Sequence, residues 1–330
     1  MNSFGRLFRI SVYGESHGQS VGVVIDGCPA GIPLSEKDFE KDLMERRSGA
    51  RGTSTRREPD KPIIMSGLFR GRTTGAPLTV HFRNTDVDSK TYKSVRDIPR
   101  PGHADYVAVK KYGGFNDHRG GGHFSGRMTL GLVASGVVAK KLILPMKVRA
   151  HLVEAGGDAN IAQAVECALS SEDSIGGIIE CIVIDVLPKL GEPFFDSVES
   201  LVSHAMFSVP GVKGIEFGAG FASARMRGSE YNDPIISARG KTKTNNCGGI
   251  NGGITNGNDL LLRVAVRPPS SIGAIQHTYD FVKKKRVRVS IPGRHDACIA
   301  LRMPVIVESV VSVVLADLCL LDQQLSRVTR

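Results

Sequence analysis

Tryptophan is absent from this sequence, and aromatic residues make up only 6% of its 330 positions. Proteins that bind single-stranded nucleic acid usually stack bases on aromatic side chains, so the scarcity of aromatics argues against that class. The six cysteines form no Cys-x-x-Cys pair and lie mostly within apolar segments. This pattern indicates reduced, buried thiols in a cytoplasmic protein rather than a disulfide-stabilised secreted one.

Uninterrupted apolar segments of membrane-spanning length are also missing. The N-terminus has no apolar stretch as long as that of a signal peptide, so we do not expect secretion. Two apolar segments, 127–144 and 303–321, have helical patterns, but charged residues interrupt each of them. We therefore expect neither segment to cross a membrane and expect no membrane partner.

Positive charge, by contrast, is abundant. The 43 lysines and arginines exceed the 33 aspartates and glutamates, which gives a formal net charge of +10. Such a balance predicts a surface or cleft that attracts anions, whether nucleic acid, acidic lipid or small phosphorylated metabolites. Hydrophobic residues make up 41% of the chain, enough for one large core, and no linker-like change in composition divides it. We expect residues 1–330 to form a single domain.

Helical and strand-like patterns are mixed along the chain without the regular alternation of a doubly wound fold. Alternating apolar residues predict strands, and longer apolar periods predict helices. This arrangement predicts the α+β class. The expected strands include 7–13, 21–26, 178–187, 212–225 and 260–266, and the expected helices include 35–47, 130–144, 159–169 and 304–325.

The polar loop 14–18 (Gly-Glu-Ser-His-Gly) lies between the first two expected strands. It formally matches the Gly-x-Ser-x-Gly pattern of serine hydrolases, but that pattern needs a helix directly after the serine, whereas strand 21–26 follows here. A hydrolase is therefore disfavoured. His17 is a candidate proton donor beside an anion, because imidazole changes charge near neutral pH. The alternative is a loop histidine that only satisfies backbone groups.

Residues 46–57 form a basic, glycine-containing stretch that we expect to be a loop. Arginine forks bind carboxylate and phosphate oxygens, which makes this stretch a candidate anion site; an exposed, solvated charge run is the alternative. Together with the basic segment 283–288 it could also contact RNA, but no nucleic-acid-binding motif accompanies it. We therefore favour a compact polyanionic metabolite over nucleic acid. The arginines of the stretch are Arg46, Arg47, Arg51, Arg56 and Arg57.

Two glycine motifs differ in how well they fit an anion site. Gly-Lys-Thr at 240–242 resembles the end of a nucleotide-binding P-loop, but Ile235 stands where the first glycine of that motif is required. The triple glycine 120–122 precedes an expected helix, so its backbone N–H groups can approach an anion or a flavin edge; a tight turn is the alternative. His118 and His123 flank it, yet no third ligand follows at helical spacing, so we expect no metal site.

Three further motifs combine an ionisable group with turn residues that hold it: 100–106 (RPGHADY), 267–272 (RPPSSI) and 293–298 (GRHDAC). Individually each is compatible with a structural loop. Together with the loop at 14–18 they supply acids, cationic clamps for anions and one proton acceptor. That combination is typical of an elimination enzyme acting on a phosphate.

Several of these motifs occur in an order that resembles the chorismate synthase family. They are GESHG followed by VGVVIDGCPAGIPL, then RREPD, RPGHADY, RGGG with Ser-x-Arg after it, SSIG and GRHD. The likeness extends from about Gly5 to Leu321, nearly the whole chain, and chance does not produce agreement of that length. It implies a β-α-β sandwich, in which a helical layer lies between two antiparallel sheets, and assembly as a homotetramer.

The resemblance also implies an activity. As a lyase of the shikimate pathway of aromatic amino acid biosynthesis, the protein would convert 5-enolpyruvylshikimate 3-phosphate to chorismate by anti 1,4-elimination of phosphate and the C6 hydrogen. Reduced FMN (FMNH2) would be required although the reaction is redox-neutral, and NADPH would act only indirectly, through flavin reduction. The chain lacks insertions found in longer members, so we expect an external flavin reductase to supply the reduced cofactor.

By the same correspondence, four residues carry the catalytic roles. His17 is expected to protonate the leaving phosphate, and His103 to control the protonation of the flavin. Asp296 is expected to take the proton from flavin N5, and Ser16 to relay protons.

The binding residues implied by the resemblance fall into two sets. The residues expected to bind substrate, or for the first two an NADP phosphate, are Arg46, Arg51, Arg100 and Arg127. The residues expected to contact FMN are His123, Phe124, Ser125, Pro210, Gly211, Gly252, Arg267, Pro268, Pro269, Ser270, Ser271 and Arg294. The sequence departs from the usual family pattern at His123-Phe124, where Arg-Ser is usual, and at Pro269, where threonine is usual.

Overall fold

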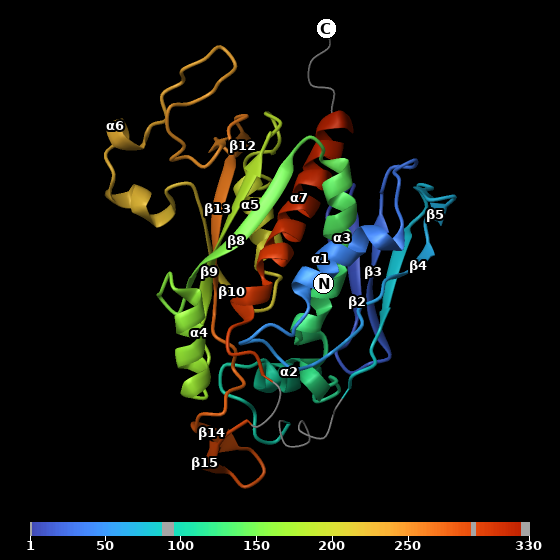
Figure 1. Ribbon diagram of the computed structural model, residues 1–330, viewed down its shortest axis with the longest axis vertical. Helices are drawn as coiled ribbons and strands as arrows, with labels where there is room; N and C mark the ends of the chain where they lie inside the picture. The colour runs from blue at the N-terminus through green and yellow to red at the C-terminus, as the bar shows by residue number, and fades with distance from the viewer. Residues whose placement is uncertain (1, 88–95, 292–294, 325–330) are drawn as a thin grey trace.

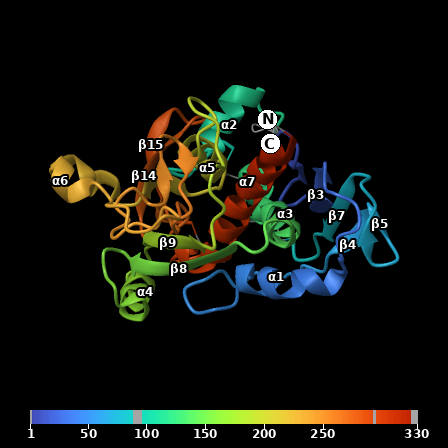
Figure 2. The same cartoon turned by 90° about the horizontal axis from the view of Figure 1, so that it is seen from above.

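The computed structural model describes residues 2–87, 96–291 and 295–324, which form two antiparallel sheets with a layer of helices between them (Figure 1). Figure 2 shows the same arrangement from above, with one sheet on each side of helices α3 (Thr129–Leu142) and α7 (Pro304–Gln324). The predicted α+β class and the β-α-β sandwich are confirmed.

The first sheet contains five strands in the order β1-β2-β3-β7-β4, each antiparallel to its neighbour. Its inner face is built by strict alternation: Val23 of β3 pairs with Val80 of β7, and both are fully buried. Between such residues, Thr79 and His81 point to the other face, as the period of two in a strand requires. The strands are β1 (Ser3–Phe4), β2 (Arg9–Gly14), β3 (Ser20–Asp26), β4 (Ile63–Ser66) and β7 (Leu78–Arg83).

The second sheet contains four strands in the order β10-β13-β9-β8, also antiparallel. Leu262 of β13 pairs with Cys181 of β9, and both side chains are fully buried against the helical layer. All six cysteines of the chain are free, as predicted, but only Cys28, Cys181 and Cys298 are buried, and Cys167 is exposed. The strands are β8 (Lys147–Ala155), β9 (Gly177–Ile184), β10 (Val212–Phe217) and β13 (Leu260–Val266).

The helical layer is apolar on most of its surface because sheets cover both of its sides. Helix α3 contacts β2 and β3 of the first sheet, whereas α7 contacts β8 and β9 of the second. The two helices approach closely at Gly136, where an added Cβ would lie 2.3 Å from the Cβ of Ser309. Glycine is therefore needed at this crossing. Helices α1 (Glu40–Arg46) and α5 (Val198–Met206) complete the layer through contacts with α3 and α7.

The remaining elements lie around the sandwich. The short strands form three hairpins: β5 (Leu68–Phe69) with β6 (Arg72–Thr73), β11 (Ile250–Asn251) with β12 (Ile254–Thr255), and β14 (Gln276–Asp280) with β15 (Lys285–Val289). The other helices are α2 (Asp105–Tyr112), α4 (Ile161–Ser170) and α6 (Gly228–Tyr231). The 3-10 helices are η1 (Glu36–Phe39), η3 (Arg119–Phe124), η4 (Gly126–Met128), η5 (Gly220–Arg225) and η6 (Ile299–Arg302).

Two expectations about local structure need correction. The expected strand 212–225 ends at Phe217, because Gly218 adopts a φ of 55° and turns the chain into η5. Helix α7 is, by length and composition, apolar enough to cross a membrane, although its charges led us to expect otherwise. In the fold, 78% of its apolar window is buried, as in the core helix of a sandwich.

Candidate active site

A cavity of about 540 Å³ lies at the end of the helical layer where α3 and α7 begin. Thr129, the first residue of α3, lines it, and so does Ile306 in the first turn of α7. The N-terminus of a helix carries partial positive charge, so both helices favour an anion in this space. Segments far apart in the sequence supply the rest of the wall, among them 46–60, 120–127 and 267–271.

The loop at 14–18 packs against the triple glycine. Ser16 lines the cavity and is fully buried, and His17 lies beside it with only 9% of its surface exposed. A Cβ at Gly120 would lie 2.6 Å from His17 Nε2 and 2.8 Å from Ser16 Oγ. Gly120 also has a φ of 58°, a conformation that side chains rarely adopt. Glycine is thus required for this histidine and serine to come next to the loop.

The motif at 100–106 forms a tight charged cluster behind one wall. His103 lines the cavity, and its Nδ1 lies 2.6 Å from Asp105 Oδ1. Arg100 donates to both Asp105 oxygens at 2.8 Å and to Ser271 Oγ at 2.9 Å. Burial alone would raise the pKa of Asp105, but the hydrogen bonds from Arg100 and His103 hold it well below its usual range. The carboxylate therefore stays charged and orients His103 toward the cavity.

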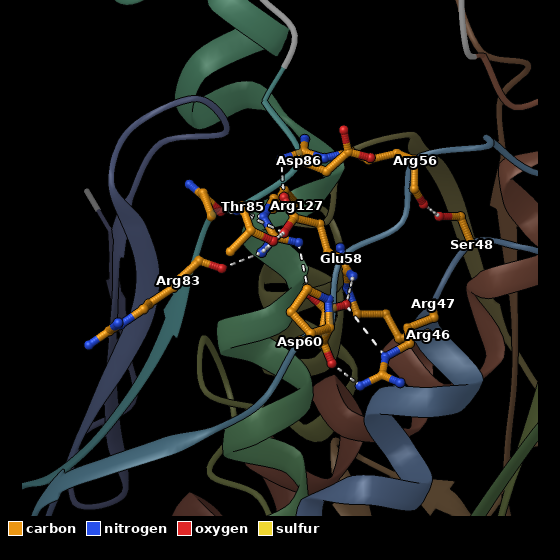
Figure 3. Close-up of polar contacts among 12 residues, drawn as sticks. Arg46, Arg47, Ser48, Arg56, Glu58, Asp60, Arg83, Thr85, Asp86 and Arg127 are labelled. Carbon is orange, nitrogen blue, oxygen red and sulfur yellow. Dashed lines mark hydrogen bonds and ion pairs between the residues drawn. The ribbon is translucent and has the colours of Figure 1, made fainter.

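Arginines and carboxylates from the 46–60 stretch and Arg127 of η4 contact one another in a second cluster that lines the cavity (Figure 3). Asp60 is 2% exposed; its Oδ1 accepts from Arg127 Nη1 at 2.8 Å, and its Oδ2 lies 3.4 Å from Arg46 Nη1. Glu58 accepts from Arg56 at 2.7 Å. These pairs hold three guanidinium groups rigidly instead of leaving them solvated, which contradicts the alternative of an exposed charge run for this part of the stretch.

The charge in this cluster is not balanced. Burial lowers the pKa of Arg46 to about 9, Asp60 opposes that effect, and the cations Arg302, Arg127 and Arg56 add to it. Arg46 therefore remains charged near neutral pH but lies in a strongly positive field. Seven arginines line the cavity against three carboxylates, a surplus that an anionic ligand would neutralise.

Asp296 reaches the cavity from the segment before η6. Its Oδ1 accepts from the backbone N–H of Ser54 at 2.9 Å, and its Oδ2 accepts from Arg302 Nη2 at 2.8 Å. The first contact ties the basic 46–57 stretch to the C-terminal part of the chain. The carboxylate is thereby fixed at the cavity wall beside a cation.

Part of the wall could hold a planar cofactor. Phe124, Pro210, Pro269, Ile299 and Met303 supply apolar surface, and residues with hydroxyl and guanidinium groups line the same cavity. Gly211 leaves space there, because a Cβ would lie 2.8 Å from Ile299 Cδ1. These polar residues include Ser125, Arg267, Ser270 and Ser271. Apolar surface combined with polar groups fits the isoalloxazine ring of a flavin.

Most of the residues expected from the sequence meet at this cavity, but some do not. Arg51 is exposed and ion-paired with Glu166, and Gly252 lies in the exposed β11–β12 turn. His123 lines an adjoining cavity of about 200 Å³ and packs on Phe124, with ring centroids 4.1 Å apart. His17, Arg100 and Pro268 do not line the main cavity but adjoin residues that do, and Arg294 lies outside the described residues.

Glu58, Asp60 and Arg302 line the cavity but were not assigned a site role from the sequence. The acidic pair lies within the RREPD motif, where two carboxylates directly follow two arginines. That juxtaposition was a usable signal, since carboxylates beside an arginine cluster commonly orient it. No comparable signal marks Arg302, which a sequence view places at the start of an apolar helix.

Comparisons with known proteins identify the family of the chain. The family model described as "Chorismate synthase" matches residues 8–320. A protein of Chitinophaga pinensis named chorismate synthase is 57% identical over 329 residues, which cover 99% of each chain. One of Korarchaeum cryptofilum with the same name is 45% identical, covering 95% of this chain and 96% of its own. A solved structure titled "Crystal Structure of Chorismate Synthase" superposes with a TM-score of 0.74 at 25% identity, covering 98% and 94% of the two chains.

The resemblance, the sandwich and the cationic cavity therefore agree. The chain belongs to the chorismate synthase family: it is a carbon–oxygen lyase that eliminates phosphate from 5-enolpyruvylshikimate 3-phosphate to give chorismate, in the last step of the shikimate pathway.

Proposed function

We propose that the cavity at the start of α3 and α7 is the active site and that it works with reduced FMN. One observation carries this proposal: Ser16, His103, Ser125 and Asp296, from four separate segments, line one cavity with seven arginines. A substrate with two carboxylates and a phosphate needs such a surplus of cations, because its charges lose their hydration as the site fills.

The part of the wall that combines apolar surface with polar groups would hold the flavin. Phe124, Ser125, Pro210, Gly211, Arg267 and 269–271 are the residues at that place. When bound, the reduced flavin supplies electron density as the C–O bond breaks and recovers it when the C6 hydrogen leaves. Phe124, at a position where the family usually has serine, would add an aromatic face, and Pro269 an apolar one. NADPH would take part only by reducing flavin, through an external reductase.

The chain's own groups would manage protons. His17 would protonate the departing phosphate, with Ser16 as a relay, because both lie next to the Gly120 turn. His103 would control the protonation of the flavin, since Asp105 fixes which ring nitrogen faces the cavity. Asp296 would accept a proton at a carboxylate oxygen and later release it to solvent.

Substrate anions would bind to the arginines of the cavity. Arg46 and Arg127 are preorganised by Asp60, so little reorganisation is needed when an anion arrives. Arg100 would act through His103 and Ser271. Arg51, exposed and paired with Glu166, would serve a phosphate outside the main cavity, such as that of NADP.

The wider setting of the enzyme is also a proposal. Residues 1–330 would form one domain, since helices from both halves of the chain share one core. The protein would be a cytoplasmic homotetramer that binds neither nucleic acid nor membranes and no metal ion.

An anaerobic assay tests the proposal. Purified protein is given 5-enolpyruvylshikimate 3-phosphate and reduced FMN, and inorganic phosphate and chorismate are measured together. We expect equal amounts of both products, and at least about tenfold slower turnover in His17→Ala and in His103→Ala. Near-normal rates in both variants would show that the proton roles are misassigned, and turnover without flavin would refute the need for the cofactor.

A further inference from the structure

Asp296 and Arg302 form an ion pair whose geometry suits a change of partner. Asp296, just before η6, and Arg302, its last residue, contact each other at 2.8 Å, and both line the cavity. Arg302 uses Nη2 for this contact, while the backbone N–H of Ser54 occupies the other carboxylate oxygen. Both oxygens of the carboxylate are thus engaged before any ligand is bound.

In this position the guanidinium group of Arg302 does not use all of its hydrogen-bond donors. Its Nε is buried and, among the described residues, has no hydrogen-bond partner. A buried, charged donor without an acceptor is unfavourable, so an oxyanion that reaches the fork would gain a contact that the protein does not provide. Arg302 also lies close enough to Arg46 to contribute, with Arg127 and Arg56, to the positive field on that residue. The side chain therefore belongs to a part of the cavity where neighbouring cations favour an anion.

We propose that Arg302 exchanges Asp296 for an oxyanion of the substrate, a phosphate or carboxylate group, and thereby frees Asp296 to accept a proton. The planar fork of arginine can hold an oxyanion through Nε and Nη2 together, a geometry that Asp296 does not use. When Arg302 binds the substrate anion instead, the Asp296 carboxylate loses a charged hydrogen-bond donor, which makes it a stronger base. The proton it takes leaves a neutral carboxyl, which returns the proton to solvent after product release.

This exchange would make the base available only when the site is filled. Without ligand, the guanidinium caps the carboxylate; with ligand, it caps the substrate anion. The inference rests on the proposed role of Asp296, but the movement of Arg302 can be measured without turnover. Inorganic phosphate, a product of the reaction, is the probe.

Phosphate binding to the flavin-free protein would be measured by calorimetry in wild type, R302Q, D296N and the double variant. R302Q should bind phosphate about tenfold more weakly, since a charge-assisted bidentate contact is lost. D296N should bind about threefold more tightly, because Arg302 no longer has a competing carboxylate. The double variant should bind phosphate no more tightly than R302Q alone.

A matched control separates partner exchange from a general change in charge. Glu58 is also a cavity carboxylate paired with arginines, but its partners are Arg56, at 2.7 Å, and Arg127, at 3.8 Å. E58Q should therefore tighten phosphate binding equally in the wild-type and R302Q backgrounds. If D296N also gives the same gain in both backgrounds, the exchange does not occur. Thermal unfolding of every variant checks the fold.

R302K provides a second measurement should R302Q not fold. Its ammonium can pair with Asp296 but has no Nε fork, so phosphate affinity should fall about threefold; unchanged affinity would overturn the proposal. If the proposed elimination activity itself were wrong, the wild-type protein would release no phosphate from the substrate. That result is distinct from a failure of the partner exchange.

Discussion

The buried carboxylate of Asp60 offers the sharpest test of how the cavity is held together. Asp60 compensates three arginines at once: Nη1 of Arg127 lies at 2.8 Å, Nη1 of Arg46 at 3.4 Å and Nε of Arg47 at 4.0 Å. Only 2% of its surface is exposed. Asp60→Asn removes the negative charge but keeps nearly the same side-chain size and shape. The residue adopts a φ of 46°, a left-handed conformation that asparagine tolerates well, so the substitution adds no backbone strain.

The expected loss follows from burial. Removing one partner of a buried ion pair costs about 3–5 kcal/mol, since the remaining charge is left uncompensated. Asparagine keeps one acceptor for Arg127, so we expect a loss at the lower end, about 3 kcal/mol of unfolding free energy. The matched control is Asp26→Asn, which breaks the Arg9–Asp26 pair at 3.2 Å with both side chains about half exposed. That change should cost no more than about 1 kcal/mol.

Urea unfolding at neutral pH, followed by circular dichroism, gives both values. Added inorganic phosphate should stabilise the Asp60→Asn variant more than the wild type, because an anion can partly replace the missing charge between Arg46 and Arg127. Equal losses in Asp60→Asn and Asp26→Asn would refute the reasoning. A large loss in Asp60→Asn with no extra response to phosphate would show that packing, and not charge, makes Asp60 important.

Two further predictions concern the walls of the cavity. The pKa of Asp105 is lower in the folded protein than in the unfolded chain, so its stabilisation is present above about pH 4 and is lost as the pH falls further. The difference in unfolding free energy between wild type and Asp105→Asn should therefore be largest near pH 7 and should shrink toward pH 3; a constant difference would contradict it. Gly120→Ala should displace His17 and lower turnover at least about tenfold. Its control, Gly71→Ala, has a φ of 72° but nothing within 4 Å of the added Cβ, so it should lose some stability while keeping its activity.

Much of the fold was accessible from the sequence because its signals are local. Alternating apolar residues predicted the paired strands around 21–26 and 260–266, and the apolar run 130–144 predicted α3. The end of β10 was missed, since the pattern of a strand does not show where a glycine will take a left-handed turn. The apolar character of α7 could not distinguish a core helix from a membrane span, because only the two covering sheets decide between them.

The candidate site was accessible only in part. Motif resemblance pointed to His103 and Asp296, and both line the same cavity. The contacts that orient such groups were not accessible, because they join residues far apart in the chain, such as Asp60 with Arg127. Arg51 shows the opposite error, a residue that the sequence places in the site but the structure does not. It belongs to the basic stretch, yet it is exposed and forms an ion pair with Glu166. Sequence identifies the chemical groups, while tertiary contacts decide which of them share a space.

These contacts also explain why a site for a multiply charged substrate contains buried carboxylates at all. Arginines without partners would repel one another and be poorly ordered, whereas full pairing would leave no charge for the ligand. Asp60, Glu58 and Asp296 each compensate between one and three of the seven arginines, which fixes the guanidinium groups but leaves the cavity positive. The substrate then completes the charge balance. A ligand with a single negative charge cannot do so, and we therefore attribute selectivity for polyanions to the number of carboxylates in the wall as much as to the arginines.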